Sequence, residues 1–178
     1  MTRNRYGGWI RTFSGKQVYP FDPDVSMIAI EDIGWALSCI PRFNGHTREP
    51  YSVAQHSVMV AMYSPKQHRL HALLHDASEA YLCDIPSPLK PYFAGYQAFE
   101  EKLQATIYKR FSLYPQIPEE VHDVDRKMLV TEMHTLTKTP VDIKEGYQLS
   151  IDCWTQGKSY LAFMLMFYQL MKNTAKVV

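Results

Sequence analysis

The sequence is poor in the features that define several common protein classes. Its three cysteines in 178 residues, Cys39, Cys83 and Cys153, lie far apart and form no CxxC pair. This spacing argues against a disulfide scaffold and favours a reduced, cytoplasmic location. The N-terminal stretch MTRNRYGGWIRTFSG contains no apolar run of the kind found in signal peptides, so none is predicted there.

Excess charge and long apolar runs are also missing. The formal net charge is +1, so whole-chain electrostatics do not predict binding to a nucleic acid. The most apolar stretch, residues 160–171, is too short to cross a bilayer and is typical of a buried or interface helix. We therefore expect no nucleic-acid partner and no membrane partner, although a local basic pocket for one small phosphate compound is compatible with this balance.

The length and the hydrophobic periodicity predict one domain, residues 1–178, of the all-α class. A turn at residues 14–16 between two short extended runs predicts a small β-hairpin within residues 8–20. Ser52 is a typical N-cap, and Pro118 lies near a helix start. The predicted helices cover residues 30–40, 53–63, 66–82, 94–111, 117–136 and 154–172.

One helical stretch carries more ionisable residues than a core helix tolerates. The sequence LLHDASEAYLCDIPSPLK, residues 73–90, places His75, Asp76 and Glu79 within an apolar run, and unpaired charge is costly to bury. Imidazole nitrogens and carboxylate oxygens are good ligands for divalent first-row metals. On a continuous helix Glu79 would share the face of His75 and Asp76.

Two further candidate ligands lie on the apolar faces of other predicted helices. His56 has Val53 and Val60 as neighbours, and Asp125 lies beside Val124. Together with His75 and Asp76 they offer two nitrogens and two oxygens from three helices. That set predicts a site for one divalent transition metal (Mn, Fe, Co, Ni or Zn) with positions left open for water.

Other interpretations of these residues stay open at this point. His71 and His75 are also four residues apart and could bind zinc together, although the intervening HALLH sequence lacks the glutamate of a metalloprotease motif. Asp125 could instead pair with the adjacent Arg126 or Lys127. Each histidine or aspartate alone is a weak signal, and the joint pattern is what favours a metal site.

The combined pattern of His56, His75–Asp76 and Asp125 resembles the HD-domain metal-dependent phosphohydrolase superfamily. The segments RFNGHTREPYSVAQHSV, HALLHDASEAYLCDIPSPLK and DVDRKMLVTE are similar to the small nucleotide-hydrolysing members, which include bacterial 5′-deoxynucleotidases and phage dATP triphosphohydrolases. The resemblance covers roughly residues 30–136. It implies an HD-domain helical bundle and the four metal ligands named above.

The resemblance also implies roles for residues beyond the ligands. Glu79 and Asp84 are expected to be catalytic, because they can take or give protons at the attacking water and the leaving group. Lys90 is expected to bind phosphate as a compact positive charge. The alternative for Glu79 and Lys90 is an ordinary surface role. The alternative for Asp84 is to cap a local turn.

The segment PRFNGHTRE carries further substrate-binding candidates. By resemblance, Arg42 would grip phosphate and Phe43 would pack against the sugar or base, at a position where deoxynucleotidases more often have Trp. His46 and Arg48 are additional phosphate-binding candidates with weaker support.

These expectations define a function with alternatives. We expect a hydrolase that attacks the α-phosphorus of a small-molecule deoxynucleotide, favoured as a dNTP, with dATP as one candidate, and releasing triphosphate. Such an enzyme could also use Mg on the substrate phosphates and, if phage-encoded, would act in the host cytoplasm. A 5′-deoxynucleotidase acting on dNMPs is the alternative within the same chemistry. A non-catalytic nucleotide-binding regulatory module and a plain helical interaction protein are the alternatives outside it.

The apolar C-terminal helix bears on assembly. A single domain has little interior with which to cover it, so the helix predicts a homo-oligomer. Burial within the monomer would explain the same pattern.

Overall fold

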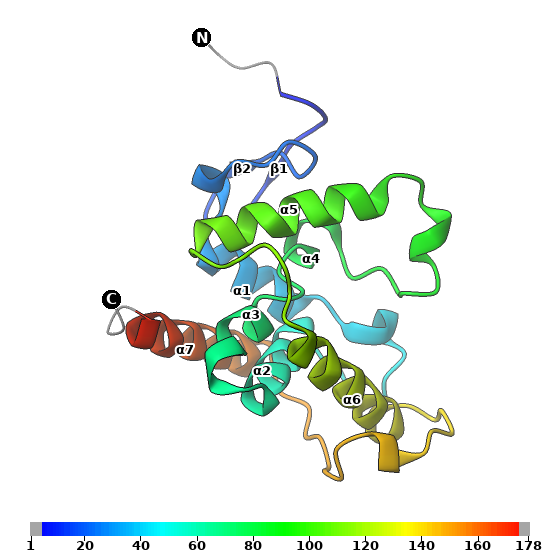
Figure 1. The fold of residues 1–178 in the computed structure, drawn as a ribbon. Helices are drawn as coiled ribbons and strands as arrows, with labels where there is room; N and C mark the ends of the chain where they lie inside the picture. The colour runs from blue at the N-terminus through cyan, green and yellow to red at the C-terminus, as the bar shows by residue number, and fades with distance from the viewer. Residues whose placement is uncertain (1–4, 175–178) are drawn as a thin grey trace.

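Helices make up most of the chain in its computed structural model, which describes residues 5–174 (Figure 1). The all-α class with a small N-terminal hairpin is thereby confirmed, and within the described residues no helix is long and apolar enough to cross a membrane. The α-helices are α1 (Ile30–Cys39), α2 (Val53–Tyr63), α3 (Arg69–Leu73), α4 (Glu79–Leu82), α5 (Tyr96–Arg110), α6 (Glu119–Leu136) and α7 (Gln156–Thr174). Short 3-10 helices cover Val25–Met27, Arg42–Gly45, Lys66–His68, Lys90–Tyr92 and Ile143–Glu145.

The predicted hairpin consists of two very short antiparallel strands. Strands β1 (Ile10–Arg11) and β2 (Gln17–Val18) pair with Ile10 opposite Val18. The buried carboxylate of Asp32 on α1 accepts hydrogen bonds from the backbone nitrogen and the hydroxyl of Ser14, at 2.6 and 2.8 Å. The hairpin is therefore attached to α1 through its turn.

Helix α2 is the centre of the bundle. It packs against α1, α3, α6 and α7 (Figure 1), and its residues from Val53 to Val58 are all buried, the polar ones included. Ser52 caps it as predicted, accepting a hydrogen bond from the backbone nitrogen of Gln55 at 3.2 Å. A helix surrounded on all sides places its polar side chains in the interior, and this is how His56 comes to lie inside the protein.

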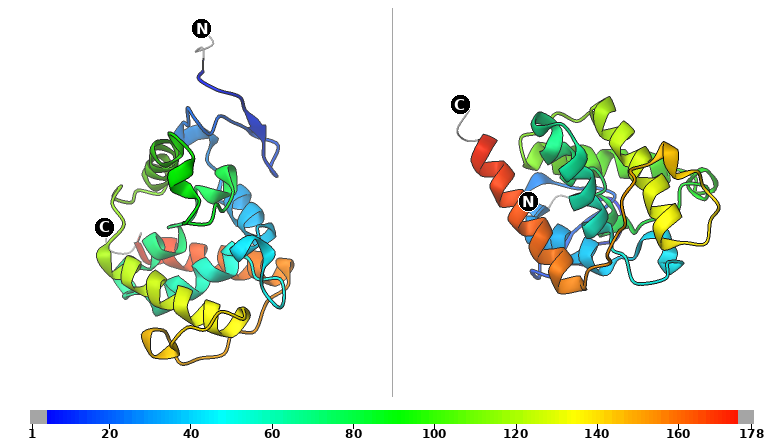
Figure 2. Two further views of the ribbon diagram at one scale, coloured as in Figure 1. Left: turned by 90° about the vertical axis from the view of Figure 1, so that its right-hand side faces the viewer. Right: turned by 90° about the horizontal axis from the view of Figure 1, so that it is seen from below.

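Helix α7 is covered on one side only. Phe163 and Phe167 are buried, and Gly34 lets α1 approach closely, because a Cβ there would lie 3.1 Å from the Phe163 ring. Leu161 and Leu165 on the other side are 60% and 62% exposed, and the helix lies along one edge of the molecule (Figure 2). Burial within the monomer therefore accounts for one side of the helix, and the homo-oligomer stays a prediction.

The single helix predicted over residues 66–82 is wrong. Helix α3 ends at Leu73, and α4 begins only at Glu79. Between them the backbone nitrogens of Ala77 and Glu79 bond to carbonyls three residues back, those of Leu74 and Asp76, which is the tighter pitch of a 3-10 turn. The His75–Asp76 pair therefore lies on an interrupted segment and not on a regular helix face.

A side chain distant in sequence stabilises this interruption. Gln104 of α5 donates from Nε2 to the Leu74 carbonyl at 2.7 Å and accepts at Oε1 from the Ser78 backbone nitrogen at 2.9 Å. It thus satisfies two buried backbone groups that a continuous helix would have paired internally. Local periodicity cannot reveal such a partner.

Replacement of Gln104 tests this role. We expect Gln104→Leu to lower the free energy of unfolding by about 2–4 kcal/mol, because it leaves two buried backbone groups unpaired. Urea denaturation measures the change. Gln97→Leu, on an exposed part of the same helix, is the control, and equal losses in the two variants would contradict the account.

Candidate metal centre

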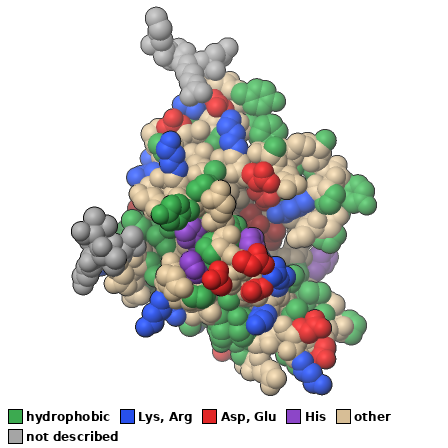
Figure 3. Space-filling model, viewed as in Figure 1, with side chains coloured by type: hydrophobic (Ala, Val, Ile, Leu, Met, Phe, Trp, Pro, Cys, Tyr) green, Lys and Arg blue, Asp and Glu red, His purple; other side chains and the backbone are tan. Residues whose placement is uncertain are grey.

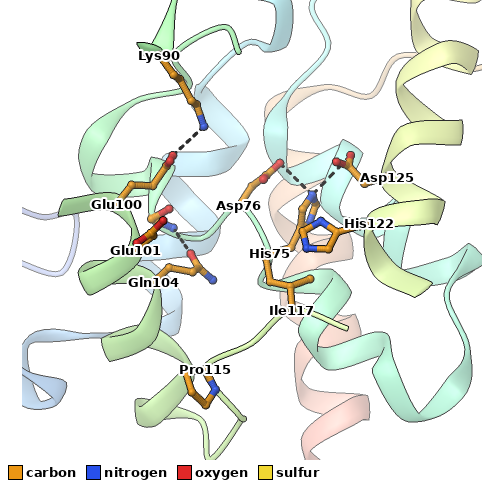
Figure 4. Close-up of a pocket in the computed structure, with 11 residues that line it drawn as sticks. His75, Asp76, Lys90, Glu100, Glu101, Gln104, Pro115, Ile117, His122 and Asp125 are labelled. Atoms are coloured by element: carbon orange, nitrogen blue, oxygen red, sulfur yellow. Dashed lines mark hydrogen bonds and ion pairs between the residues drawn. The ribbon is translucent and has the colours of Figure 1, made fainter. Parts of the chain in front are cut away.

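Four side chains predicted as ligands converge at one point. His56 comes from α2, His75 and Asp76 from the interruption at residues 74–78, and Asp125 from α6. The Nε2 atoms of the two histidines are 3.3 Å apart. Asp125 Oδ1 lies 3.1 Å from His56 Nε2 and 3.7 Å from His75 Nε2. Figure 4 shows His75, Asp76 and Asp125 pointing toward one another.

The spacing of these atoms fits a single divalent ion. Ligand atoms of His56, His75 and Asp125 all lie within 4.8 Å of one another. Adjacent ligands about 2.0–2.2 Å from one ion are separated by roughly 2.8–3.6 Å in octahedral or tetrahedral coordination, close to the separations observed here. Asp76 Oδ2 lies 3.2 Å from His75 Nε2 and 3.5 Å from His56 Nε2. The cluster of His56, His75 and Asp125 could therefore hold a metal ion, with Asp76 as its neighbour.

The electrostatics of the cluster favour a cation. Burial alone would lower the pKa of His75, but Asp76 and Asp125 raise it well above its ordinary value. Burial would likewise raise the pKa of the two aspartates, yet the imidazoles lower both. Carboxylates that hold protonated imidazoles can equally hold a metal ion, so metal binding here would compete with protons.

A further carboxylate, which the sequence analysis missed, lies behind His56. Glu132 of α6 is fully buried, and its Oε1 is 2.6 Å from His56 Nδ1. Glu132 follows Asp125 by seven residues, two helical turns, on the face that also buries Val124 and Met128. That position on an otherwise apolar stripe was the signal available in the sequence.

Arg42 lies at the site but is already paired. Its Nη2 is 3.1 Å from Glu132 Oε2, and its Nη1 is 3.5 Å from Asp76 Oδ2. Although burial lowers the pKa of Arg42, the carboxylates of Glu132 and Asp76 more than offset this and raise it. Phe43 follows with a φ of 55°, an uncommon conformation for a bulky side chain, and its ring is 5.6 Å from the Arg42 guanidinium carbon.

The two predicted catalytic carboxylates occupy different surroundings. Glu79 is buried, and its Oε2 has no hydrogen-bond partner among the described residues. Burial, followed by the charges of Asp76 and Asp84, raises the pKa of Glu79 well above its ordinary value. Asp84 is half-buried, and burial is also the main cause of its raised pKa. Cys83, directly before it, has a φ of 67° and a ψ of 158°, a strained region for a residue other than glycine.

A cavity of about 350 Å³ opens beside the cluster, between α5 and α6 (Figure 4). On the face of the molecule shown in Figure 3, acidic and histidine side chains gather near the middle. Lys90 reaches the cavity but is paired with Glu100 at 2.9 Å. The lining residues are His75, Asp76, Ser78, Lys90, Glu100, Glu101, Gln104, Pro115, Ile117, His122 and Asp125. His122 was missed in the sequence, although it lies one helical turn before Asp125.

Three other candidates are not brought to the cluster. Arg48 bonds through its backbone nitrogen to the Leu136 carbonyl and through Nη2 to the Thr137 carbonyl, so it caps the end of α6. His46 is exposed and does not line the described cavity. His71 directs Nε2 to the Tyr114 carbonyl at 3.1 Å. The alternative zinc pair of His71 and His75 fails because α3 ends between them.

Fold and site together define an all-α protein with a candidate divalent-metal centre. Over 128 residues the chain is 43% identical to the uncharacterized protein YfdR of Escherichia coli, and the match covers 72% of each chain. It is 38% identical over 120 residues to the uncharacterized protein RCAP_rcc00048 of Rhodobacter capsulatus, covering 62% of this chain and 61% of that protein. The chain belongs to the same family as YfdR. No family model matches it.

The raised pKa of Glu79 predicts a pH-dependent effect on stability. A carboxyl group whose folded pKa is raised contributes stability below its ordinary value of 4.5 that is lost as pH rises through the folded value. Glu79→Gln stays neutral throughout. We expect this variant to match the metal-free wild type near pH 4 and to exceed it at pH 8 by about 1–3 kcal/mol. Denaturant unfolding with chelator at several pH values measures the difference, and a gap independent of pH would contradict the assignment.

Proposed function

We propose that this chain is a metal-dependent phosphohydrolase that acts at the α-phosphorus of a deoxynucleotide. The observation that carries the proposal is the convergence of His56, His75, Asp76 and Asp125, with the buried carboxyl of Glu79 close by in the chain. The choice of a nucleotide as the substrate class comes from the resemblance to HD-domain phosphohydrolases. The paired imidazoles and carboxylates would hold Mn, Fe, Co, Ni or Zn.

In this proposal each group has a separate task. When bound, the ion supplies Lewis acidity, which polarises a phosphoryl oxygen and acidifies a water molecule. Glu79, whose pKa is raised by burial and by the charges of Asp76 and Asp84, takes the proton of the attacking water. Asp84, also with a raised pKa, gives a proton to the sugar oxygen as its bond to phosphorus breaks. Lys90 lines the cavity and binds the phosphate.

Backbone strain supports the placement of a site here. Among the described residues, four other than glycine adopt positive φ values, and Phe43 and Cys83 directly adjoin Arg42 and Asp84, whereas Ser112 adjoins no candidate site residue. Such conformations cost of order 1–3 kcal/mol and cluster at functional sites. Their occurrence on two separate segments is consistent with a site assembled between them.

The number of phosphates that the site could hold depends on the cations available to bind them. The dNTP is favoured in the sequence by the resemblance to phage triphosphohydrolases and by four cationic residues that could neutralise a triphosphate, Arg42, His46, Arg48 and Lys90. Arg42 is paired with Glu132 and Asp76, and Arg48 caps α6. Of these four residues, Lys90 is the one that lines the cavity. Few cations remain for a chain of phosphates. We therefore propose the dNMP as the better substrate, with the dNTP as the competing candidate.

A substrate panel tests the proposal. Chelator-treated protein is reloaded with Mn, Co or Zn and incubated with deoxy- and ribonucleoside mono- and triphosphates, and phosphate, pyrophosphate and triphosphate are separated. We expect phosphate from dNMPs only when metal is present. Triphosphate from dNTPs would reverse our preference. Metal binding without any product would favour the regulatory module, and no bound metal would favour the interaction protein.

Substitutions separate metal binding from catalysis. We expect His56→Ala and Asp76→Asn to lose both metal and turnover. Glu79→Gln should keep the metal and lower turnover by about 10²–10⁴-fold, the usual contribution of a general acid or base. Metal content by elemental analysis and turnover are measured on the same samples. His71→Ala, a buried histidine outside the cluster, should retain both, and a Glu79→Gln protein without metal would contradict these roles.

A further inference from the structure

Glu132 is a buried carboxylate that three other side chains contact through hydrogen bonds. Its Oε1 is 2.6 Å from His56 Nδ1 and accepts from the Tyr51 hydroxyl at 2.8 Å. Its Oε2 accepts from Arg42 Nε at 3.1 Å. A fully buried charge persists only where donors of this kind offset its desolvation.

We propose that Glu132 is the positioning residue of the metal centre: it orients His56 toward the metal and joins that ligand to the loop of residues 42–51. The inference rests on the metal-binding part of the proposed function and not on the choice of substrate. It adds to the site a residue that need not touch metal or substrate.

The first argument concerns the imidazole. An ionised carboxylate only accepts hydrogen bonds, so Nδ1 of His56 must carry the proton that lies between it and Glu132. A neutral imidazole then has its lone pair on Nε2, the atom that faces His75 and Asp125. A hydrogen bond on the second ring nitrogen also fixes the ring orientation and raises the basicity of the ligand.

His75 provides a comparison within the same site. Its Nδ1 bonds to the Ala72 carbonyl at 2.7 Å, which leaves Nε2 toward the cluster. Both imidazoles are thus held from behind at Nδ1, one by a neutral carbonyl and one by a charged carboxylate. The carboxylate is the stronger partner, so His56 is expected to be the more tightly oriented ligand.

The second argument concerns the loop. Arg42 and Tyr51 lie near its two ends, and the Arg42 backbone nitrogen bonds to the Tyr51 carbonyl at 2.8 Å. The side chains of both residues end on Glu132. One carboxylate therefore contacts a candidate metal ligand and both ends of the loop. If the ordered loop helps Glu132 to hold His56 in place for the metal, a bound metal must stabilise the loop in return, because coupling between two sites is reciprocal.

A purely structural ion pair between Glu132 and Arg42 is the competing explanation, and it predicts a loss of stability without a specific effect on metal binding. Glu132→Gln preserves the shape and removes the charge. Phe163→Leu on α7, a buried substitution outside the site, provides a matched loss of stability. Both are made in the full chain.

The experiment measures zinc affinity by competition with a coloured chelator, together with the melting temperature of the metal-free protein. We expect Glu132→Gln to bind zinc about 10–100-fold more weakly than the wild type. Phe163→Leu should melt at a lower temperature and bind zinc like the wild type. Equal affinity in wild type and Glu132→Gln would overturn the inference and leave the proposed function intact, whereas a wild type that binds no metal would overturn both.

Two measurements on the wild type keep the inference testable even if Glu132→Gln does not fold. Nitrogen-15 NMR of the zinc-loaded protein should show the His56 proton on Nδ1, and a proton on Nε2 would overturn the inference. Zinc should also slow amide hydrogen exchange at Arg42, and an unchanged rate would remove the proposed link to the loop.

Discussion

The structure depends on the mutual neutralisation of charges that it removes from water. Two imidazoles lie between the carboxylates of Asp76, Asp125 and Glu132, at separations of 2.6–3.7 Å. Each group alone would be costly to bury, and together they raise the pKa values of the histidines and lower those of the acids. The helices around them bring these opposite charges into contact.

The fold supplies that arrangement through α2 and the interruption after α3. Because α2 is surrounded by other helices, the side chain of His56 is fully buried. Because α3 ends at Leu73, His75 and Asp76 leave the regular helix path, and they contact His56 of α2 while His75 also contacts Asp125 of α6. Gln104 satisfies the backbone at this interruption. The interruption at residues 74–78 is thus stabilised by α5, and it places His75 and Asp76 at the candidate metal centre.

The sequence predicted those features of the fold and the site that depend on short-range patterns of residues. The ends of α1, α2, α5 and α6 lie within two residues of the predicted bounds, because Ser52, Pro41 and the apolar periodicity act locally. His56, His75, Asp76 and Asp125 were predicted from residue type and face. The interruption was missed because Gln104 lies 26 residues beyond Ser78. Glu132 and the contacts of Arg48 with the end of α6 were missed, because they depend on how the loop and α6 pack together.

The most direct test of the metal centre is a crystal structure of the protein grown with cobalt or manganese, with anomalous diffraction recorded at the absorption edge of that metal. The account predicts one strong peak about 2.0–2.2 Å from Nε2 of His56, Nε2 of His75 and a carboxylate oxygen of Asp125. An ion bound elsewhere, or Asp125 turned away from the two histidines at full metal occupancy, would contradict it.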